Sequence, residues 1–173
     1  VLKLVDSGKS MPIILIDGRS NSGKSTLAAE IQNIIFKDGE SAPRVVHMDD
    51  LYQGWNGLDA GADYLNRFVI APIGKREGAS WQEWSWADDA RSGEWREFRG
   101  GTPLIVEGCG ALNGVSSLAA HIRVWLEVPE GVRHQRWIDR EGNDEFWPRW
   151  SAQEVEFYAR EKSDELADIV ATN

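Results

Sequence analysis

The sequence predicts an α/β domain built on a doubly wound parallel sheet, with helices on both faces of the sheet. Short apolar runs typical of buried strands alternate with helical patterns along its 173 residues. The first of these runs, residues 13–16, leads into a glycine-rich loop and then into a helix. Two later runs end in acidic residues, and ligands bind outside the carboxyl ends of strands in such sheets. We therefore expect the functional site along that edge of the sheet.

The loop after the first strand matches the phosphate-binding pattern G-x-x-x-x-G-K-S, from Gly18 to Ser25. Apolar residues then recur at helical spacing to about residue 36, so the loop joins a strand to a helix. Its glycines let backbone N–H groups point inward, and the helix N-terminus adds partial positive charge, which suits a polyphosphate. Lys24 is expected to reach the β- and γ-phosphates, and the Ser25 hydroxyl to ligate Mg²⁺. The predicted donor-binding residues are Gly18, Ser20, Asn21, Ser22, Gly23, Lys24, Ser25 and Thr26.

The second strand is predicted over residues 44–48, after a polar lead-in at 1–10 and a helix stop at Asp38 and Gly39. It delivers Asp49 and Asp50 at its carboxyl end. Adjacent acids repel each other unless a metal, a base function or water offsets the repulsion. At least one of them is expected to face the phosphate loop, with a solvated turn or a helix cap as the structural alternative.

The segment from about 51 to 102 is predicted to be an insert that carries the acceptor site. A helix is expected over 58–70, ended by the alanine and proline that follow it. Residues 74–101 show no sustained period and predict a long loop, which in a compact domain is usually functional. Its tryptophans suit stacking on a flat ligand or, as the alternative, a satellite core over the sheet. They are Trp81, Trp84, Trp86 and Trp95.

Two further buried strands are predicted over residues 103–108 and 122–128. Glu107 closes the first of them beside a glycine, which is the position of a Walker-B-like carboxylate. Pro129 follows the second strand and is well placed as the first residue of a helix.

On that helix Arg133, Arg136 and Arg140 share one face, because they are spaced at i, i+3 and i+7. Such a stripe suits an anionic partner, and an exposed helix paired with neighbouring acids is the alternative. A short lid is expected over about 140–150, where a glycine breaks the helix. A capping box at 151–154 predicts the start of the last helix, and residues 167–170 predict a final strand.

Composition narrows the partners of this chain to small molecules. The formal net charge of −9 argues against nucleic acid, because binding to a phosphate backbone needs a basic surface. No run approaches the roughly 18 apolar residues of a membrane span. The single Cys109 excludes an intramolecular disulfide framework and suits a reducing, cytoplasmic location. One domain is expected at this length, and the sequence leaves open whether it forms a homo-oligomer.

These segments together resemble the uridine-kinase-like branch of the P-loop nucleoside and nucleotide kinases over most of the chain. Residues 18–26 look like that family's phosphate loop, and residues 49–52 resemble its D-x-F-Y segment, whose first aspartate is the base for the acceptor hydroxyl. The Trp-Ser-Trp triplet at 84–86 resembles the family's Y-D-F stretch, which contacts the acceptor base. The arginine helix is similar to the helix that leads into the lid.

The resemblance implies a single three-layer α/β/α kinase domain over 1–173, like the nucleoside monophosphate kinases, with a short lid. It implies an enzyme that uses ATP and Mg²⁺ to phosphorylate a hydroxyl of a nucleoside, nucleotide or similar small molecule. The implied roles are catalysis by Lys24, Asp49, Arg133 and Arg136, acceptor contact by Tyr52, Trp84 and Trp86, and metal binding by Ser25 and Glu107.

Two other kinds of nucleotide-binding protein are alternatives to a kinase. A GTPase switch needs a guanine-reading N-K-x-D motif, and the sequence has no Asn-Lys pair. A non-catalytic or regulatory ATP-binding protein stays open, and Asp49 is the residue that discriminates, since a mere binder has no need of a base there.

Overall fold

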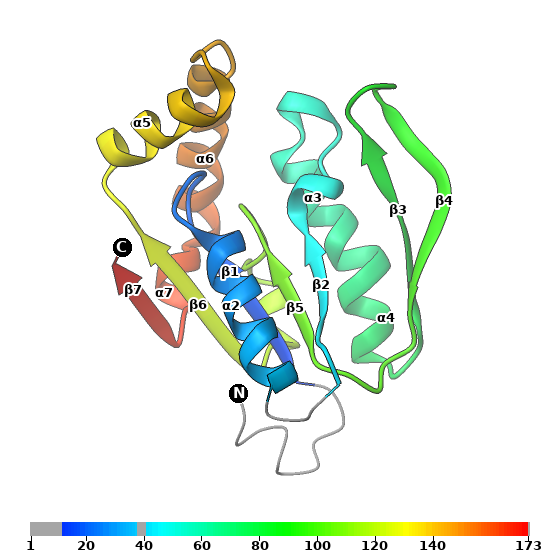
Figure 1. The fold of residues 1–173 in the computed structure, drawn as a ribbon. Coiled ribbons are helices and arrows are strands. Elements are labelled where there is room, and N and C mark those ends of the chain that lie inside the picture. The colour runs from blue at the N-terminus through cyan, green and yellow to red at the C-terminus, as the bar shows by residue number, and fades with distance from the viewer. Residues whose placement is uncertain (1–11, 38–40, 173) are drawn as a thin grey trace.

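A computed structural model of the chain describes residues 12–37 and 41–172 (Figure 1). The predicted lead-in at 1–10 and the helix stop at Asp38 and Gly39 lie outside the described residues. Five parallel strands form the central sheet, in the order β2-β5-β1-β6-β7. Their bounds are β1 Ile13–Asp17, β2 Arg44–His47, β5 Leu104–Glu107, β6 Ile122–Glu127 and β7 Ile169–Thr172. The predicted parallel sheet is confirmed, and its last strand begins two residues later than expected.

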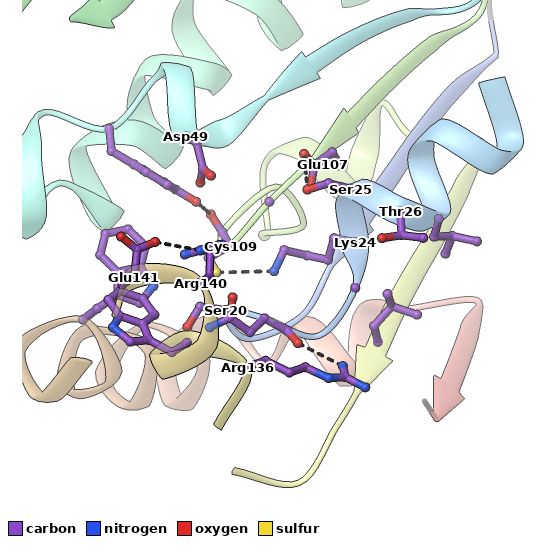
Figure 2. A pocket seen from close by; sticks show the side chains of 18 of the residues that line it. Ser20, Lys24, Ser25, Thr26, Asp49, Glu107, Cys109, Arg136, Arg140 and Glu141 are labelled. Atoms are coloured by element: carbon purple, nitrogen blue, oxygen red, sulfur yellow. Dashed lines mark hydrogen bonds and ion pairs between the residues drawn. The ribbon is translucent and has the colours of Figure 1, made fainter. Parts of the chain in front are cut away.

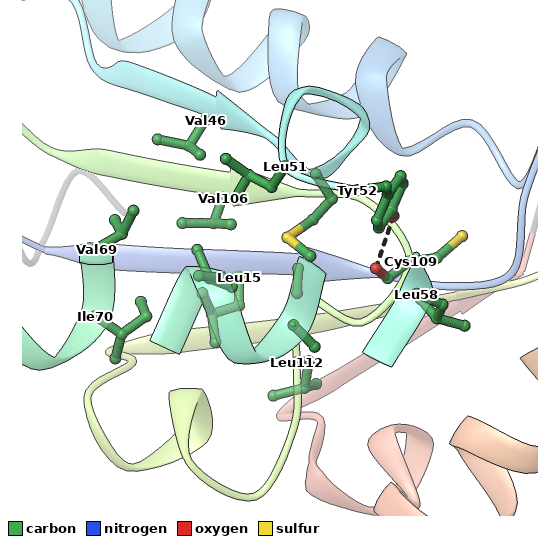
Figure 3. Packing of buried hydrophobic residues seen from close by; sticks show 14 of the residues in the cluster. Leu15, Val46, Leu51, Tyr52, Leu58, Val69, Ile70, Val106, Cys109 and Leu112 are labelled. Carbon is green, nitrogen blue, oxygen red and sulfur yellow. Dashed lines mark hydrogen bonds between the residues drawn. The ribbon is translucent and has the colours of Figure 1, made fainter. Parts of the chain in front are cut away.

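The central strand β1 is buried along its whole length, as its unbroken apolar run predicts for a strand covered on both faces. Successive side chains point to opposite faces, so Leu15 packs beneath α3 (Leu58–Leu65) while Ile14 and Ile16 pack with Ala28 of α2 (Lys24–Lys37). Figure 3 shows the cluster that contains Leu15 and Leu58. Each fully buried aliphatic side chain of this kind stabilises the fold by about 1.5–3 kcal/mol. The sheet is therefore held from both sides, and its carboxyl edge is fixed in place.

The helix predicted over 58–70 does not end where the sequence suggested. It continues from α3 through a π-helical turn, η3 (Asn66–Ile70), into α4 (Ala71–Gly74). Pro72 has no backbone N–H to donate, and it directly follows the π-helical turn, where the Ala71 amide bonds to the Asn66 carbonyl five residues earlier.

The long loop predicted over 74–101 is wrong, because this segment forms an antiparallel hairpin of β3 (Ala79–Ser85) and β4 (Ala90–Phe98). The register shifts between Gln82 and Trp84. A β-bulge of this kind interrupts the two-residue alternation by which a strand is recognised in sequence. The hairpin is held to the rest of the domain by Trp81, which is fully buried.

The C-terminal part begins with α5 (Glu130–Glu141), which ends at Gly142 in the left-handed conformation. The predicted capping box at 151–154 is wrong, because α6 (Trp147–Glu161) already begins four residues earlier. Pro148 lies in its first turn, and the Ser151 hydroxyl donates to the Pro148 carbonyl inside the helix. None of the helices within residues 12–37 and 41–172 is long and apolar enough to cross a membrane. The remaining short helices are η1 Met48–Asp50, η2 Gly54–Asn56, η4 Ser116–Leu118 and α7 Ser163–Leu166.

Candidate active site

A cavity of about 1070 Å³ lies at the carboxyl edge of the sheet (Figure 2). The phosphate loop, the ends of β2 and β5, and helices α5 and α6 all contribute to its walls. Most of the residues singled out from the sequence line it: Ser20, Asn21, Gly23, Lys24, Ser25, Thr26, Asp49, Tyr52, Trp86, Glu107 and Arg136. Gly18, Ser22, Trp84 and Arg133 lie outside this lining.

The phosphate loop has the backbone that its glycines predict. Gly23 has a φ of 98°, a conformation that favours glycine, and its carbonyl accepts the first helical hydrogen bond, from the Leu27 amide. A Cβ on Gly18 would lie 2.5 Å from the Leu126 carbonyl oxygen, so no larger residue fits between the loop and β6. These two glycines therefore fix the backbone path of the loop.

Lys24 is buried, with an exposed fraction of 7%. Its ammonium donates to the Arg19 carbonyl at 3.0 Å, so the side chain folds over the loop. Burial alone would lower the pKa of Lys24, but nearby anionic groups, among them Asp17 and Glu107, outweigh it and raise the pKa. A fixed positive charge therefore lies at the floor of the cavity.

A hydroxyl and a carboxylate meet beside this lysine. The Ser25 hydroxyl donates to Glu107 Oε1 at 3.0 Å, and His47 Nδ1 lies 2.5 Å from the same oxygen. The hydrogen bond to Glu107 raises the pKa of His47. Nothing in the sequence pattern pointed to His47, which is the last residue of β2 and reaches Glu107 only through the pairing of β2 with β5.

The oxygen donors of this corner fit Mg²⁺. The ion prefers oxygen ligands and is usually bound through one or two protein groups, with water and phosphate oxygens completing its shell. Among the described residues, no group of three or more His, Cys, Asp and Glu side chains is placed to hold a metal. A site of this type does not need such a group, and Ser25 and Glu107 are the two residues here that could offer oxygen ligands.

Asp49 lines the cavity opposite the loop, whereas Asp50 does not. It lies in the helical turn η1 that follows β2. Burial raises the pKa of Asp49, the charge of Lys24 lowers it and that of Glu107 raises it again, with a net increase. A carboxylate with a raised pKa is a better proton acceptor near neutral pH than an ordinary aspartate.

Aromatic side chains from five segments form the far end of the cavity. Trp55 lies at their centre, stacked on Phe146 with ring centroids 4.4 Å apart and planes 3° from parallel. Its ring centroid is also 5.0 Å from that of Trp86. Trp84 lies away from this group, on the hairpin, with the Arg91 guanidinium 5.5 Å from its ring. The aromatic lining residues are Tyr52, Trp55, Trp86, Trp137 and Trp150.

The three arginines of α5 have different places. Arg136 and Arg140 line the cavity, and Arg136 donates to the Asn21 carbonyl at 3.1 Å. Arg133 is buried and donates to the Val128 carbonyl at 3.1 Å and to Glu154 at 3.5 Å. The structure therefore does not bring Arg133 to the cavity as expected. Its guanidinium points toward the body of the protein, where these two acceptors hold it.

Comparison with known proteins finds likeness in structure only, since no protein-family model and no curated protein sequence matches the chain. A structure described as a possible uridine kinase from Bacillus stearothermophilus has a TM-score of 0.67 and 21% identity, covering 93% of this chain and 88% of that one. Another, provisionally described as a fructose transport system kinase from Silicibacter sp. TM1040, has a TM-score of 0.58 and 20% identity, covering 94% and 90%. The fold is that of the P-loop kinases. The expected resemblance to uridine kinase is confirmed for the fold.

Within this P-loop kinase fold, two buried acids accept hydrogen bonds from the phosphate loop, a role that the sequence did not predict for either of them. Asp17 accepts hydrogen bonds from the Leu112 amide at 2.8 Å and from the Tyr158 hydroxyl at 2.7 Å. Glu154 of α6 accepts one from the Ser20 amide at 2.5 Å. In the sequence, the only sign of this role for Asp17 is its position directly before the phosphate-binding motif.

Cys109 also lies in the wall of the cavity, between the two acids and the lysine. Its sulfur is 3.6 Å from the Lys24 nitrogen and donates to the Gly18 carbonyl at 3.4 Å. Burial raises the pKa of the Cys109 thiol, so the group is a neutral packing partner of the loop.

Proposed function

We propose that this protein is an ATP- and Mg²⁺-dependent phosphotransferase that transfers the γ-phosphoryl group to a hydroxyl of a nucleoside, nucleotide or similar small molecule. The observation that carries the proposal is that Asp49 lines the same cavity as Lys24 and Ser25. A protein that only binds nucleotide needs the loop, but it does not need a carboxylate with a raised pKa across the cavity from it.

The donor end of the cavity is formed by the loop and the residues around it. Backbone N–H groups and the start of α2 hold the phosphates of ATP, with Lys24 at the phosphate farthest from the ribose. Arg136 and Arg140 approach from α5, on the other side of the loop. When bound, Mg²⁺ would neutralise charge on the phosphate oxygens, held by Ser25 and Glu107.

In the transfer step, the acceptor oxygen forms a bond to the γ-phosphorus while the bond from that phosphorus to the β-phosphate oxygen breaks, and ADP leaves. Asp49 takes the proton of the acceptor hydroxyl. Phosphoryl transfer depends mostly on positioning and on stabilising the charge that moves between oxygens. Lys24 and the two cavity arginines supply the positive charge.

The acceptor is bound at the aromatic end. Five aromatic side chains lining one end of a cavity favour an acceptor with a flat or ring-shaped body. Trp86 is 42% exposed and so has ring surface free to contact it.

The test is a screen for ADP release over nucleosides, nucleotides, sugars and vitamin-like alcohols, with ATP and Mg²⁺ present. We expect at least one acceptor class to increase ADP formation above the rate without acceptor, with a phosphorylated product detected by mass spectrometry. The Asp49→Asn variant is the matched control and should bind ATP but lose the increase.

The rival function is a non-catalytic ATP-binding protein. It would bind ATP in an equilibrium titration, release no ADP with any acceptor and show no difference between the wild type and Asp49→Asn. That set of results would reject the kinase proposal while keeping the phosphate loop as a binding site.

A further inference from the structure

The β3–β4 hairpin lies beside β2 and α3 (Figure 1), and it contacts the turn that carries Asp49. That turn, η1, is short, and the amides of Leu51 and Tyr52 both donate to the Met48 carbonyl, at 2.8 and 3.2 Å. The carbonyls of Asp49 and Leu51 accept hydrogen bonds from two side chains of the hairpin, Trp86 and Arg91.

Arg91 of β4 makes the more rigid of these two connections. One guanidinium nitrogen donates to the Leu51 carbonyl at 2.8 Å, and the other donates to the Gln82 carbonyl at 3.3 Å, beside the register shift in β3. The guanidinium carbon also lies 3.7 Å from the centre of the Tyr64 ring, on α3. A planar guanidinium can hold two acceptors and stack on a ring at once, which a lysine cannot do.

Tyr64 completes the same junction, since its hydroxyl accepts a hydrogen bond from the Gln82 amide at 2.9 Å. The turn, the hairpin and α3 are thus joined at one arginine. Arg91 does not line the cavity, so its contacts serve the protein itself and not a ligand.

We propose that Arg91 is a positioning residue, which fixes the turn after β2 so that the Asp49 carboxylate stays in place for proton transfer. The proposal rests on the proposed function, because it assigns Asp49 the role of base. Misplacing a reacting group by about 1 Å costs on the order of 10²-fold in rate, so loosening this turn should reduce turnover.

The test compares Arg91→Met, Arg91→Lys and Arg96→Met in steady-state kinetics. Arg91→Met should lower kcat by about 10- to 100-fold and leave the KM for ATP within about twofold, because the loop that binds ATP is untouched. Arg91→Lys should recover part of the lost kcat, since its ammonium can still reach one carbonyl. Arg96 is the matched control, on the same strand, where it pairs with Glu83 at 2.9 Å in an exposed ion pair. Its variant should keep wild-type kcat.

Hydrogen exchange of the Leu51 and Tyr52 amides measures the turn directly. We expect about tenfold faster exchange at these two amides in Arg91→Met, with exchange in β1 unchanged and little change in melting temperature. Faster exchange with an unchanged kcat, or an unchanged exchange rate, would overturn the proposal. A lower melting temperature with faster exchange everywhere would also overturn it, since Arg91 would then support the fold as a whole.

The exchange measurement separates this proposal from the proposed function. If no acceptor increases ADP release in the wild type, the kinase assignment fails, and faster exchange confined to the turn would still show what Arg91 holds. If the wild type transfers phosphate and Arg91→Met does so at the wild-type rate, the positioning role alone is rejected.

Discussion

Three charged side chains face one cavity: Lys24 at the start of α2, Asp49 in the turn after β2 and Glu107 at the end of β5. Their electrostatic effects on one another decide what each can do: Lys24 lowers the pKa of Asp49, and Glu107 raises it. Removing the charge of Lys24 or of Glu107 should therefore change the pKa of Asp49.

Replacing Lys24 with alanine should abolish ADP formation and leave most of the fold intact. The ammonium contacts a carbonyl and a thiol of the protein, but its charge matters most while negative charge moves between phosphate oxygens. ADP formation and melting temperature should be measured on the same sample. Turnover near that of the wild type would remove the basis for assigning the loop as the donor site.

Asp49→Asn should lower kcat by about 10²–10⁴-fold, with little effect on ATP affinity, because general-base assistance is lost while the loop is unchanged. Asp50→Asn is the natural comparison, since Asp50 is adjacent but does not line the cavity. It should have the milder effect. If Asp50 proves to be the essential residue of the two, the assignment of the base is off by one.

At the scale of elements, the hairpin and the helices around Trp55 bring five chain segments to the acceptor end. The sequence predicts that Trp84 and Trp86 both contact the acceptor. In the structure only Trp86 lines the cavity, while Trp84 lies on the hairpin beside Arg91. They should therefore respond differently to truncation.

Trp86→Ala should raise the acceptor KM and leave ATP binding almost unchanged, because Trp86 lines the cavity beside the turn that carries Asp49 and the substitution leaves the phosphate loop unchanged. Trp84→Ala should instead lower the melting temperature, through a loss of up to about 3 kcal/mol for a partly exposed ring, with an unchanged acceptor KM. Titrating the acceptor identified in the screen against both variants, followed by tryptophan emission, distinguishes them. An unchanged acceptor KM in Trp86→Ala would count against stacking at this end.

The sequence was most informative where one element determines the structure locally. The phosphate loop, the buried strands and the placement of Asp49 and Glu107 at strand ends all follow from short patterns. Trp55, Trp137 and Trp150 could not be assigned in this way, because the packing of separate helices brings them together. The hairpin was missed for a local reason, since its register shift interrupts the alternation of its strand residues.

At the scale of the whole molecule, Asp17 makes stability depend on pH. It is fully buried, and burial raises its pKa from 3.8 to about 6 despite hydrogen bonds that favour the charged form. The folded protein then binds more protons than the unfolded chain between about pH 4 and pH 6, so the contribution of Asp17 to stability falls as the pH rises through that range. Above about pH 7 it should be constant.

Asp17→Asn should remove this pH dependence, which corresponds to about 3 kcal/mol over the range. The measurement is urea unfolding of the wild type and the variant from pH 4 to pH 7.5, taken as the difference between the two curves. Asp168 gives the opposite sign, because its pairing with Arg123 lowers its pKa and is lost as the pH falls. A wild-type curve that does not differ in slope from that of Asp17→Asn would show that Asp17 titrates normally.

The placement of β1 in the sheet has a consequence for how the chain is made. Ile14 pairs with Ile105 on one side and with Ile122 on the other, so both neighbours of the central strand come from much later in the chain. During synthesis, β1 and the inner face of α2 emerge from the ribosome before β5 and β6, the strands that cover them, have been made. Parallel pairing across such separations is slow, and exposed apolar strands recruit other chains during the delay. Substitutions within residues 13–16 should therefore lower the yield of soluble protein in the cell more readily than they lower the stability of the purified protein.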